Sequence, residues 1–335
     1  MASILLSLAV LFVAFGSDVT AGASSPLQQQ LDPNTNIFAA AEHANVRELG
    51  AEGSPLNDAY MSTYEIVATW PHDPKAFTQG LAFDRKNGNL YESDGLYHQS
   101  GVRKVDVATG QGALIKNPTG HFGEGLEIVG NKMYQLTWKE NKVHEFKLSG
   151  PSGTIEHVKE HQAPCAPSCK EGWGLAYDAA SHKLYQTDST DKLFTLDPDT
   201  LKPVGEPRQI FDSRLGRRVN GVNELEWVDG ELWGNVYPMY QGEASECIVR
   251  INATDATVLG WIDMRGLLTK QRDAVKRSPK NLVLNGIAYH PTSGRLYVTG
   301  KQWDKMYQIR VTPAERTLQT EAHIHQHCSL GRTSG

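Results

Sequence analysis

The sequence lacks several features that would place it directly in a common functional class. Its 335 residues carry a formal net charge of −5 and no long block of like charge, which excludes the basic surface typical of proteins that bind nucleic acid or anionic membranes. Walker loops, dinucleotide fingerprints and nucleophile elbows are absent. Helical periodicity is almost absent too, apart from a short stretch near 265–275. The function must therefore be argued from individual residues in a strand-rich chain.

Long hydrophobic runs are also scarce, and the clearest lies at the N-terminus. Residues 1–15 are almost entirely apolar, and small residues follow as far as Ala23. This pattern predicts a signal peptide over 1–23, with a buried terminal strand or helix as the alternative, and the run is short for a membrane span. We therefore expect a soluble protein of the secretory pathway, extracellular or vacuolar. The sequon that begins at Asn252 then predicts N-glycosylation.

Cysteine is sparse, with four in the chain. Cys165 and Cys169 flank Ala-Pro-Ser in a polar stretch, which predicts a local disulfide. Cys247 lies in a strand-like run and Cys328 in the C-terminal tail, and their pairing stays open. Because the four residues do not form two closely spaced pairs, they do not predict a zinc site.

Histidines give no better evidence for a metal. The alternating run at 323–327 lies in a polar tail without a partner cluster. His157 and His161 have the spacing of a zinc-protease pair, but no helix pattern or adjacent glutamate accompanies them. We therefore expect no metal site from the cysteines or from these histidines.

The chain contains an internal repeat. A short phrase opens an alternating apolar strand, a turn follows, and a second strand with an aromatic residue comes next. The copies begin at Gln79-Gly-Leu, Glu124-Gly-Leu, Trp173-Gly-Leu, Asn223-Glu-Leu and Asn285-Gly-Ile. They lie about 45 to 62 residues apart, the spacing expected of four-stranded propeller blades.

The repeat predicts an all-β fold, a five-bladed β-propeller of four-stranded antiparallel blades over residues 61–315. The last copy ends after its third strand, and a strand at Tyr64–Trp70 precedes the first copy. We expect this N-terminal strand to close the ring, because closure removes exposed sheet edges. Residues 24–60 are then a polar lead-in segment, and residues 316–335 are a C-terminal tail.

The openings of the copies are the candidate functional residues. The first strand of each propeller blade is the innermost, so residues at these openings converge on one end of the channel. They include a carboxyl group, amides and aromatic rings, and an ammonium group follows the second strand of the last copy. The set is Phe77, Gln79, Phe122, Glu124, Trp173, Asn223, Lys301 and Trp303.

Six short motifs make the chain resemble the plant-type glutaminyl-peptide cyclotransferases over Tyr64–Val311. They are Phe77-Thr-Gln-Gly-Leu81, Gly120-His-Phe-Gly-Glu-Gly-Leu126, Gly172-Trp-Gly-Leu175, Asn223-Glu-Leu-Glu226, Leu284-Asn-Gly-Ile-Ala288 and Val298-Thr-Gly-Lys-Gln-Trp303. The resemblance implies a five-bladed propeller that cyclises the N-terminal glutamine of peptides or proteins to pyroglutamate and releases ammonia. It also implies that no cofactor or catalytic metal is required, while a structural metal ion in the channel stays open. We expect a monomer.

The resemblance also implies roles for single residues. Glu124 matches the family's proton shuttle, and Asn223 and Lys301 are expected beside it as catalytic groups. The residues expected to bind substrate are Phe77, Gln79, Phe122, Trp138, Trp173, Tyr237 and Trp303. Tyr237 departs from the family, which commonly carries tryptophan there, and residues 238–244 form an insertion. We expect these departures to affect substrate preference more than activity.

The reaction itself asks for these residue types. The α-amine, with a pKa of ~7.7–8, is about half neutral near pH 8, and the neutral form must attack its own side-chain amide carbon. Aromatic side chains would fold the substrate into that geometry. A carboxyl group would take the amine proton and deliver it to the departing nitrogen, and burial among aromatic residues would raise the pKa of Glu124 toward the working range. Amide or ammonium donors would stabilise the oxyanion.

Two other functions remain open from the residues alone. One is a non-catalytic secreted propeller that binds peptides or sugars. The other is a calcium-dependent hydrolase, for which Glu124, Asn223 and Asn285 would be a thin set of ligands. Each candidate also has a structural alternative: the polar residues could bond to backbone groups at strand starts, and the tryptophans could pack between blades.

Overall fold

The computed structural model describes residues 59–163, 165, 168–169, 171–237, 246–278, 281–290, 292–315 and 317–328. They belong to one compact unit that runs from Gly53 to Gly335. The predicted signal peptide, nearly all of the lead-in segment and the insertion at 238–244 lie outside the described residues. In the part of the chain that is described, no helix is long and apolar enough to cross a membrane.

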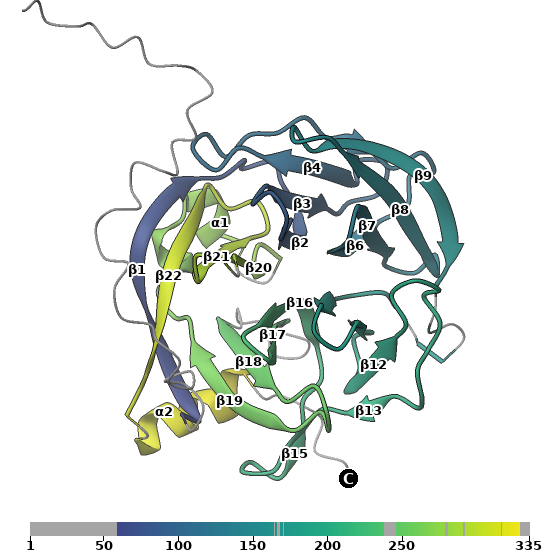
Figure 1. Ribbon diagram of the computed structural model, residues 1–335. Coiled ribbons are helices and arrows are strands. Elements are labelled where there is room, and N and C mark those ends of the chain that lie inside the picture. The colour runs from purple at the N-terminus through teal and green to yellow at the C-terminus, as the bar shows by residue number, and fades with distance from the viewer. Residues whose placement is uncertain are drawn as a thin grey trace, which may run out of the picture. The chain divides into compact units, whose positions relative to one another are not determined.

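Four-stranded antiparallel sheets dominate this unit (Figure 1). The first sheet has β2 (Thr78–Phe83), β3 (Leu90–Asp94), β4 (Gly101–Val105) and β5 (Ile115–Lys116). The second has β6 (Gly123–Val129), β7 (Lys132–Thr137), β8 (Lys142–Ser149) and β9 (Thr154–Gln162). The third has β10 (Leu175–Asp178), β11 (Lys183–Thr187), β12 (Lys192–Leu196) and β13 (Arg208–Gln209).

An eight-stranded sheet combines two further four-stranded halves. One half has β16 (Val222–Val228), β17 (Glu231–Val236), β18 (Cys247–Ile251) and β19 (Val258–Asp263). The other has β20 (Leu284–His290), β21 (Arg295–Gly300), β22 (Lys305–Pro313) and β1 (Met61–Pro71). The N-terminal strand β1 pairs antiparallel with β22 and so supplies the fourth strand of the last copy. Its first residues also pair in parallel with β19, which joins the halves.

The remaining elements are short. A two-stranded ribbon pairs β14 (Phe211–Asp212) with β15 (Arg217–Arg218). The stretch expected to be helical holds the 3-10 helix η2 (Leu268–Lys270) and helix α1 (Asp273–Lys276). The C-terminal segment contains helix α2 (Leu318–His323) and the π-helix η3 (Ile324–Cys328).

The innermost strands pack against one another. Contacts join β2 to β6, β6 to β10, β10 to β16, β16 to β20, and β20 back to β2. Glycines permit this close approach. A Cβ atom on Gly125 would lie 2.3 Å from the carbonyl oxygen of Trp173, and one on Gly174 would lie 2.0 Å from that of Asn223. The glycine that recurs in the repeat is therefore a packing requirement.

The hydrophobic core is divided among the spaces between neighbouring sheets. Between the first and second sheets, for example, Tyr91 and Val102 pack against Leu126, Met133 and Phe146. All five of these side chains are at most 1% exposed. The apolar alternation read from the sequence thus places one side of each strand in the space shared with the next sheet.

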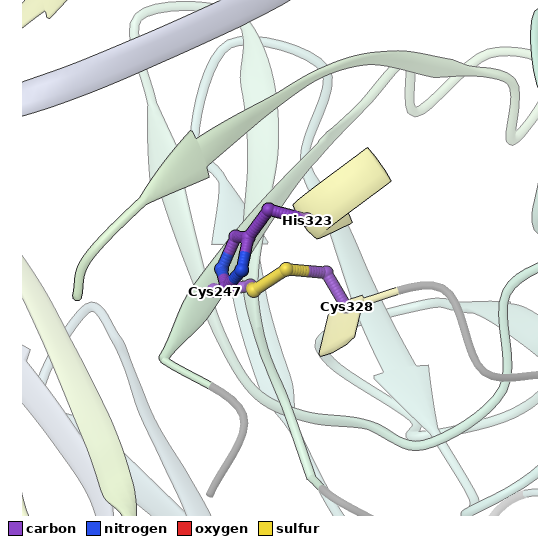
Figure 2. A group of neighbouring side chains, drawn as sticks. All are labelled: Cys247, His323 and Cys328. Carbon is purple, nitrogen blue, oxygen red and sulfur yellow. A yellow bond between two sulfur atoms is a disulfide. The ribbon is translucent and has the colours of Figure 1, made fainter. Parts of the chain in front are cut away.

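Two disulfides are present. Cys165 and Cys169, the pair expected from the sequence, are bonded with their Cα atoms 5.2 Å apart. The open pair is bonded as well: Cys247 of β18 is joined to Cys328 of η3, and Figure 2 shows His323 beside this bond. Ile324 and Cys328 are each 1% exposed and belong to the core around β18. The C-terminal segment is therefore docked on the sheet.

The two disulfides should contribute unequally to stability. Replacing Cys247 and Cys328 by alanine opens a loop whose ends are 81 residues apart, and the chain-entropy model puts the loss at roughly 4–5 kcal/mol. The same change at Cys165 and Cys169, 4 residues apart, should cost about 2 kcal/mol. Denaturant unfolding of both double variants measures the difference. Equal losses of unfolding free energy in the two variants would contradict the larger contribution assigned to the Cys247–Cys328 disulfide.

Candidate active site

The candidate site is built on irregularities in the inner strands. The antiparallel register shifts between Thr78 and Gly80, and equivalent shifts occur at 123/126, 222/225 and 284/287. Gln79, Glu124, Asn223 and Asn285 lie within these shifts. A β-bulge takes a residue out of the regular alternation and re-aims its side chain, and bulges are common beside active sites. Trp173, the opening of the third copy, directly precedes Gly174 and β10.

A hydrogen-bonded chain joins three of these openings. Asn285 Nδ2 donates to Gln79 Oε1 at 3.0 Å, and Gln79 Nε2 donates to Glu124 Oε1 at 3.0 Å. The exposed fractions of these three side chains are only 1%, 2% and 3%. Three separate inner strands thereby fix the Glu124 carboxyl group through one of its oxygens.

Three buried oxygens at these openings stay without a partner. Glu124 Oε2, Asn223 Oδ1 and Asn285 Oδ1 accept no hydrogen bond from any described residue. Nearly all buried polar atoms in folded proteins are hydrogen-bonded, because an unpaired one costs about 1–3 kcal/mol. Each such exception needs an explanation, and a bound ligand that donates hydrogen bonds supplies one.

The electrostatics of Glu124 favour a proton acceptor of raised basicity. Burial raises the pKa of the Glu124 carboxyl group well above its usual value. The positive charge of Lys301 lowers this pKa, whereas Glu171 and Glu140 raise it. The raised pKa makes the Glu124 carboxylate a stronger base than a free glutamate, as a group that must accept and return a proton requires.

Lys301 carries the positive charge that lowers the pKa of Glu124. Burial lowers the pKa of the Lys301 ammonium group to about 8, and the carboxylate of Glu124 acts in the opposite direction. Lys301 Nζ lies 5.1 Å from the ring centroid of Phe77 and 5.0 Å from that of Tyr237. Two cation–π contacts therefore hold the ammonium group and partly replace the water that burial removes.

Aromatic side chains gather around these polar groups. Phe122 contacts Phe77 edge-on at 6.2 Å between ring centroids, and Trp138 and Tyr97 at 5.4 Å each. Trp173 contacts Tyr237 edge-on at 5.9 Å. Five of the six aromatic residues expected to bind substrate, all except Trp303, thus belong to this group.

Glu171 links two of the tryptophans. The indole nitrogens of Trp138 and Trp173 donate to the same oxygen, Glu171 Oε2, at 2.7 and 2.8 Å. The shared carboxylate sets the orientation of both rings. Their positions are therefore specified by hydrogen bonds as well as by packing.

Sequence reasoning missed Tyr97 and Glu171 as members of this group. It placed Asn285 at the opening of the fifth copy but considered it only as a possible calcium ligand. Glu171 precedes the Gly172-Trp173 motif by one residue, a weaker signal. Tyr97 lies in a loop with a positive φ at each flanking residue, and no repeat pattern marks it.

Trp303 is placed in the core and not among these residues. Its side chain is 0% exposed, it packs in the cluster between the halves of the eight-stranded sheet, and its indole nitrogen donates to the carbonyl oxygen of Leu282 at 2.9 Å. Because it follows Lys301 by two residues, it anchors the segment that carries the lysine. The substrate-binding role expected for Trp303 is therefore replaced by a packing role.

The fourth copy differs from the others at its second position. Glu224 stands where the other copies carry glycine, and its carboxyl oxygens accept from the backbone amides of Leu81 at 3.3 Å and Ile287 at 2.9 Å. Burial raises its pKa well above the usual value. Glu224 thus connects three inner strands, which is the backbone-bonding alternative considered for the polar residues.

The expected glycosylation site lies in the connection between β18 and β19. Asn252 Oδ1 accepts from the backbone amide of Thr254 at 2.8 Å, which forms a local turn. The side chain is half-buried. Glycosylation at this position stays a prediction.

Comparisons with known proteins agree with the motifs. The profile of the family described as glutamine cyclotransferase matches residues 36–311. The glutaminyl-peptide cyclotransferase of Arabidopsis thaliana is 38% identical over 282 residues, which cover 83% of this chain and 80% of that protein. The crystal structure of Myxococcus xanthus glutaminyl cyclase is similar with a TM-score of 0.64 and 31% identity, and the match covers 77% of this chain and 100% of that chain. The chain belongs to the glutamine cyclotransferase family.

Proposed function

We propose that this chain is a glutaminyl-peptide cyclotransferase that converts the N-terminal glutamine of peptides or proteins to pyroglutamate and uses Glu124 to move the proton. The observation that carries the proposal is the state of the Glu124 carboxyl group. It is buried, one oxygen is held by Gln79, and the other has no hydrogen-bond partner among the described side chains and backbone groups. Family membership supports the reaction, and the geometry supports this residue.

The reaction can be written with balanced atoms. The neutral α-amine nitrogen attacks the side-chain amide carbon of the glutamine and forms the ring C–N bond. Glu124 Oε2 accepts a proton from the attacking nitrogen and then delivers it to the amide nitrogen, which leaves as ammonia when the old C–N bond breaks. The carboxylate is regenerated at the end. A general acid–base group in such a role contributes about 10²–10⁴-fold to the rate.

The other residues orient the substrate and stabilise charge. The negative charge that develops on the amide oxygen would be met by Lys301, whose ammonium group lies against Phe77 and Tyr237. Asn223 Oδ1 would accept from the substrate amine, which explains its lack of a partner within the described chain. The aromatic group around Phe122 would hold the side chain folded toward the amine.

The proposal includes the architecture that presents the site. The three four-stranded sheets and the two halves of the eight-stranded sheet would be five blades of a β-propeller. The cyclic contacts of β2, β6, β10, β16 and β20 support this, and the pairing of β1 with β22 supports closure through the N-terminal strand. Gln79, Glu124, Trp173, Asn223 and Asn285 would then share one end of the channel.

We also propose how the chain is processed and where it is located. The apolar N-terminal run and the two disulfides support entry into the secretory pathway, with residues 1–23 removed, Asn252 glycosylated and the enzyme extracellular or vacuolar. We propose a monomer that needs no cofactor, because carboxyl, ammonium, amide and aromatic groups of the chain account for every step of the reaction.

Ammonia release tests the proposed function. Purified protein incubated with a Gln-initiated dipeptide should release one ammonia per pyroglutamyl product, and the reaction should continue in the presence of a chelator. A dipeptide that begins with asparagine is a matched control, because its shorter side chain cannot close the five-membered lactam. Absence of ammonia would favour the non-catalytic binding protein, and loss of turnover with chelator would favour metal-dependent chemistry.

A further inference from the structure

A group of histidines lies at the outer side of the second sheet. Strands β8 and β9 pair antiparallel, with His144 opposite Glu160 and Phe146 opposite His157. The register shifts between these pairs and leaves Val158 as an extra residue. Side chains three apart in a regular strand point to opposite faces. Because of the bulge, His157 and Glu160 instead share the face of His144.

The polar atoms of this group converge. His144 Nδ1 lies 3.2 Å from His157 Nε2 and 4.0 Å from Glu160 Oε1. His121, in the loop before β6, has its ring centroid 5.4 Å from that of His144. One ligand atom each from His121, His144 and Glu160 lie within 4.8 Å of one another. Two imidazoles and a carboxylate thus meet at one point, and the imidazole of His157 adjoins them through His144.

Two nitrogens of the group are buried without partners. His144 is 0% exposed, and its Nε2 makes no hydrogen bond to any described residue. The Nδ1 of His121 is likewise buried and unpaired within the described ranges. An unpaired buried nitrogen is costly unless a ligand compensates, and His121 Nδ1 is the one that an ion bound through His144 Nδ1 would satisfy.

We propose that His121, His144, His157 and Glu160 bind a divalent transition metal ion of the zinc class. Imidazole nitrogens with a carboxylate oxygen suit zinc, whereas calcium takes oxygen ligands. Two nitrogens bound tetrahedrally to one zinc ion at ~2.05 Å lie about 3.3 Å apart. His144 Nδ1 and His157 Nε2 form a hydrogen bond of 3.2 Å, which is close to the spacing of two nitrogens on one zinc ion.

The ion would act on the structure near the active site and not on the reaction. His121 directly precedes Phe122 and lies three residues before Glu124. A bound ion would therefore tie the edge strand β9 to the segment that carries an aromatic residue of the site and the proton shuttle. The inference rests on the histidine geometry alone, and it stands or falls independently of the proposed reaction.

A second histidine group must be kept apart in the test. His323 lies beside Cys247 and Cys328 (Figure 2), but the two sulfur atoms are bonded to each other and do not serve as metal ligands in that state. The tail also contains His325 and His327. A background with alanine at all three tail histidines removes their contribution to metal binding.

Isothermal titration of the chelator-treated, dialysed full-length chain with Zn²⁺ tests the proposal in this background. We expect one equivalent per chain and, with Co²⁺ instead, the visible absorption of a tetrahedral ion. Loss of an outer-shell partner alone costs metal affinity about 10–100-fold, so Glu160→Gln and His157→Asn should weaken binding at least tenfold. Both side chains are partly exposed, so we expect both variants to fold. His144→Ala is avoided because His144 is fully buried.

His161→Ala is the matched control. His161 lies on the same strand, pairs with Val143 on the opposite face and bonds to Glu145, so its removal should leave Zn²⁺ affinity unchanged. The proposal is overturned if the chain shows no saturable binding of one equivalent. It is overturned equally if Glu160→Gln and His157→Asn bind Zn²⁺ as tightly as the parent. Ammonia release in the same samples reports separately on the proposed function.

Discussion

Glu124→Gln should lower kcat by about 10²–10⁴-fold with little change in the affinity for a Gln-initiated dipeptide. The amide keeps the size of the carboxyl group and can still bond to Gln79, but it cannot accept and return a proton. Steady-state ammonia release measures kcat, and calorimetric titration of the slow variant with the dipeptide measures binding. Wild-type turnover by this variant would contradict the assignment of the shuttle.

We expect Glu124→Gln to stay folded, so that its loss of activity reports on the missing proton acceptor. Burial raises the pKa of Glu124 in the folded state, so stability decreases as the pH rises above the unfolded value of ~4.3. Glutamine does not titrate, and the variant should be at least as stable as wild type at neutral pH. Glu156→Gln is the control, because Glu156 is exposed on β9, away from the candidate site, and its replacement should leave kcat unchanged.

Lys301→Met should lower kcat/KM by about 10²–10³-fold, the usual loss when one donor to a developing oxyanion is removed. Methionine fills the space between Phe77 and Tyr237 without a charge. Wild type should also lose activity on the alkaline side as the ammonium deprotonates near its pKa of about 8, and the residual activity of the variant should lack that limb. The pH dependence of kcat/KM measures both effects.

The stability of the Lys301 variant provides its control. The folded-state pKa of Lys301 is lowered to about 8 from an unfolded value of ~10.4, so the buried charge destabilises the fold below pH 8. Removing the charge should therefore preserve or increase stability at neutral pH. Lys305→Met, which changes an exposed lysine four residues away, should affect neither rate nor pH profile. An alkaline limb that persists in Lys301→Met would assign that limb to another group.

Much of the candidate site could be predicted because its residues open the repeated phrase. The place of Gln79, Glu124, Trp173 and Asn223 in four copies predicts that they converge, and the family predicted from the motifs is confirmed. The bulges that re-aim these side chains leave no mark of their own in the sequence. They were recoverable only because each coincides with the polar residue and glycine that open a copy.

Residues outside the repeat were harder to place. Tyr97 joins the aromatic group from a loop, and Glu171 orients two indoles across the space between loops. Neither arrangement follows from strand periodicity. Trp303 shows the opposite error, since an aromatic residue beside Lys301 in sequence was expected in the site but packs in the core. Sequence proximity does not fix side-chain direction here, because Lys301 and Trp303 are separated by Gln302, a turn residue with a positive φ.

The second sheet gives the same lesson for histidines. The i, i+4 spacing linked His157 to His161, but a strand with one extra residue places them on different faces. His157 instead meets His144 and Glu160 across the bulge. Only the register of β8 and β9 shows which histidines can share a ligand, and single-sequence reasoning does not supply that register.

The proposed reaction depends most on a Glu124 carboxyl group whose proton affinity is set by burial and by Lys301. Carboxyl ¹³C NMR of protein labelled at glutamate, with Glu124→Gln used to assign the signal, measures that pKa directly. We predict a value well above the ordinary ~4.3, and a further rise in Lys301→Met because the ammonium that lowers it is gone. A Glu124 pKa near 4.3 that does not respond to Lys301→Met would contradict the account.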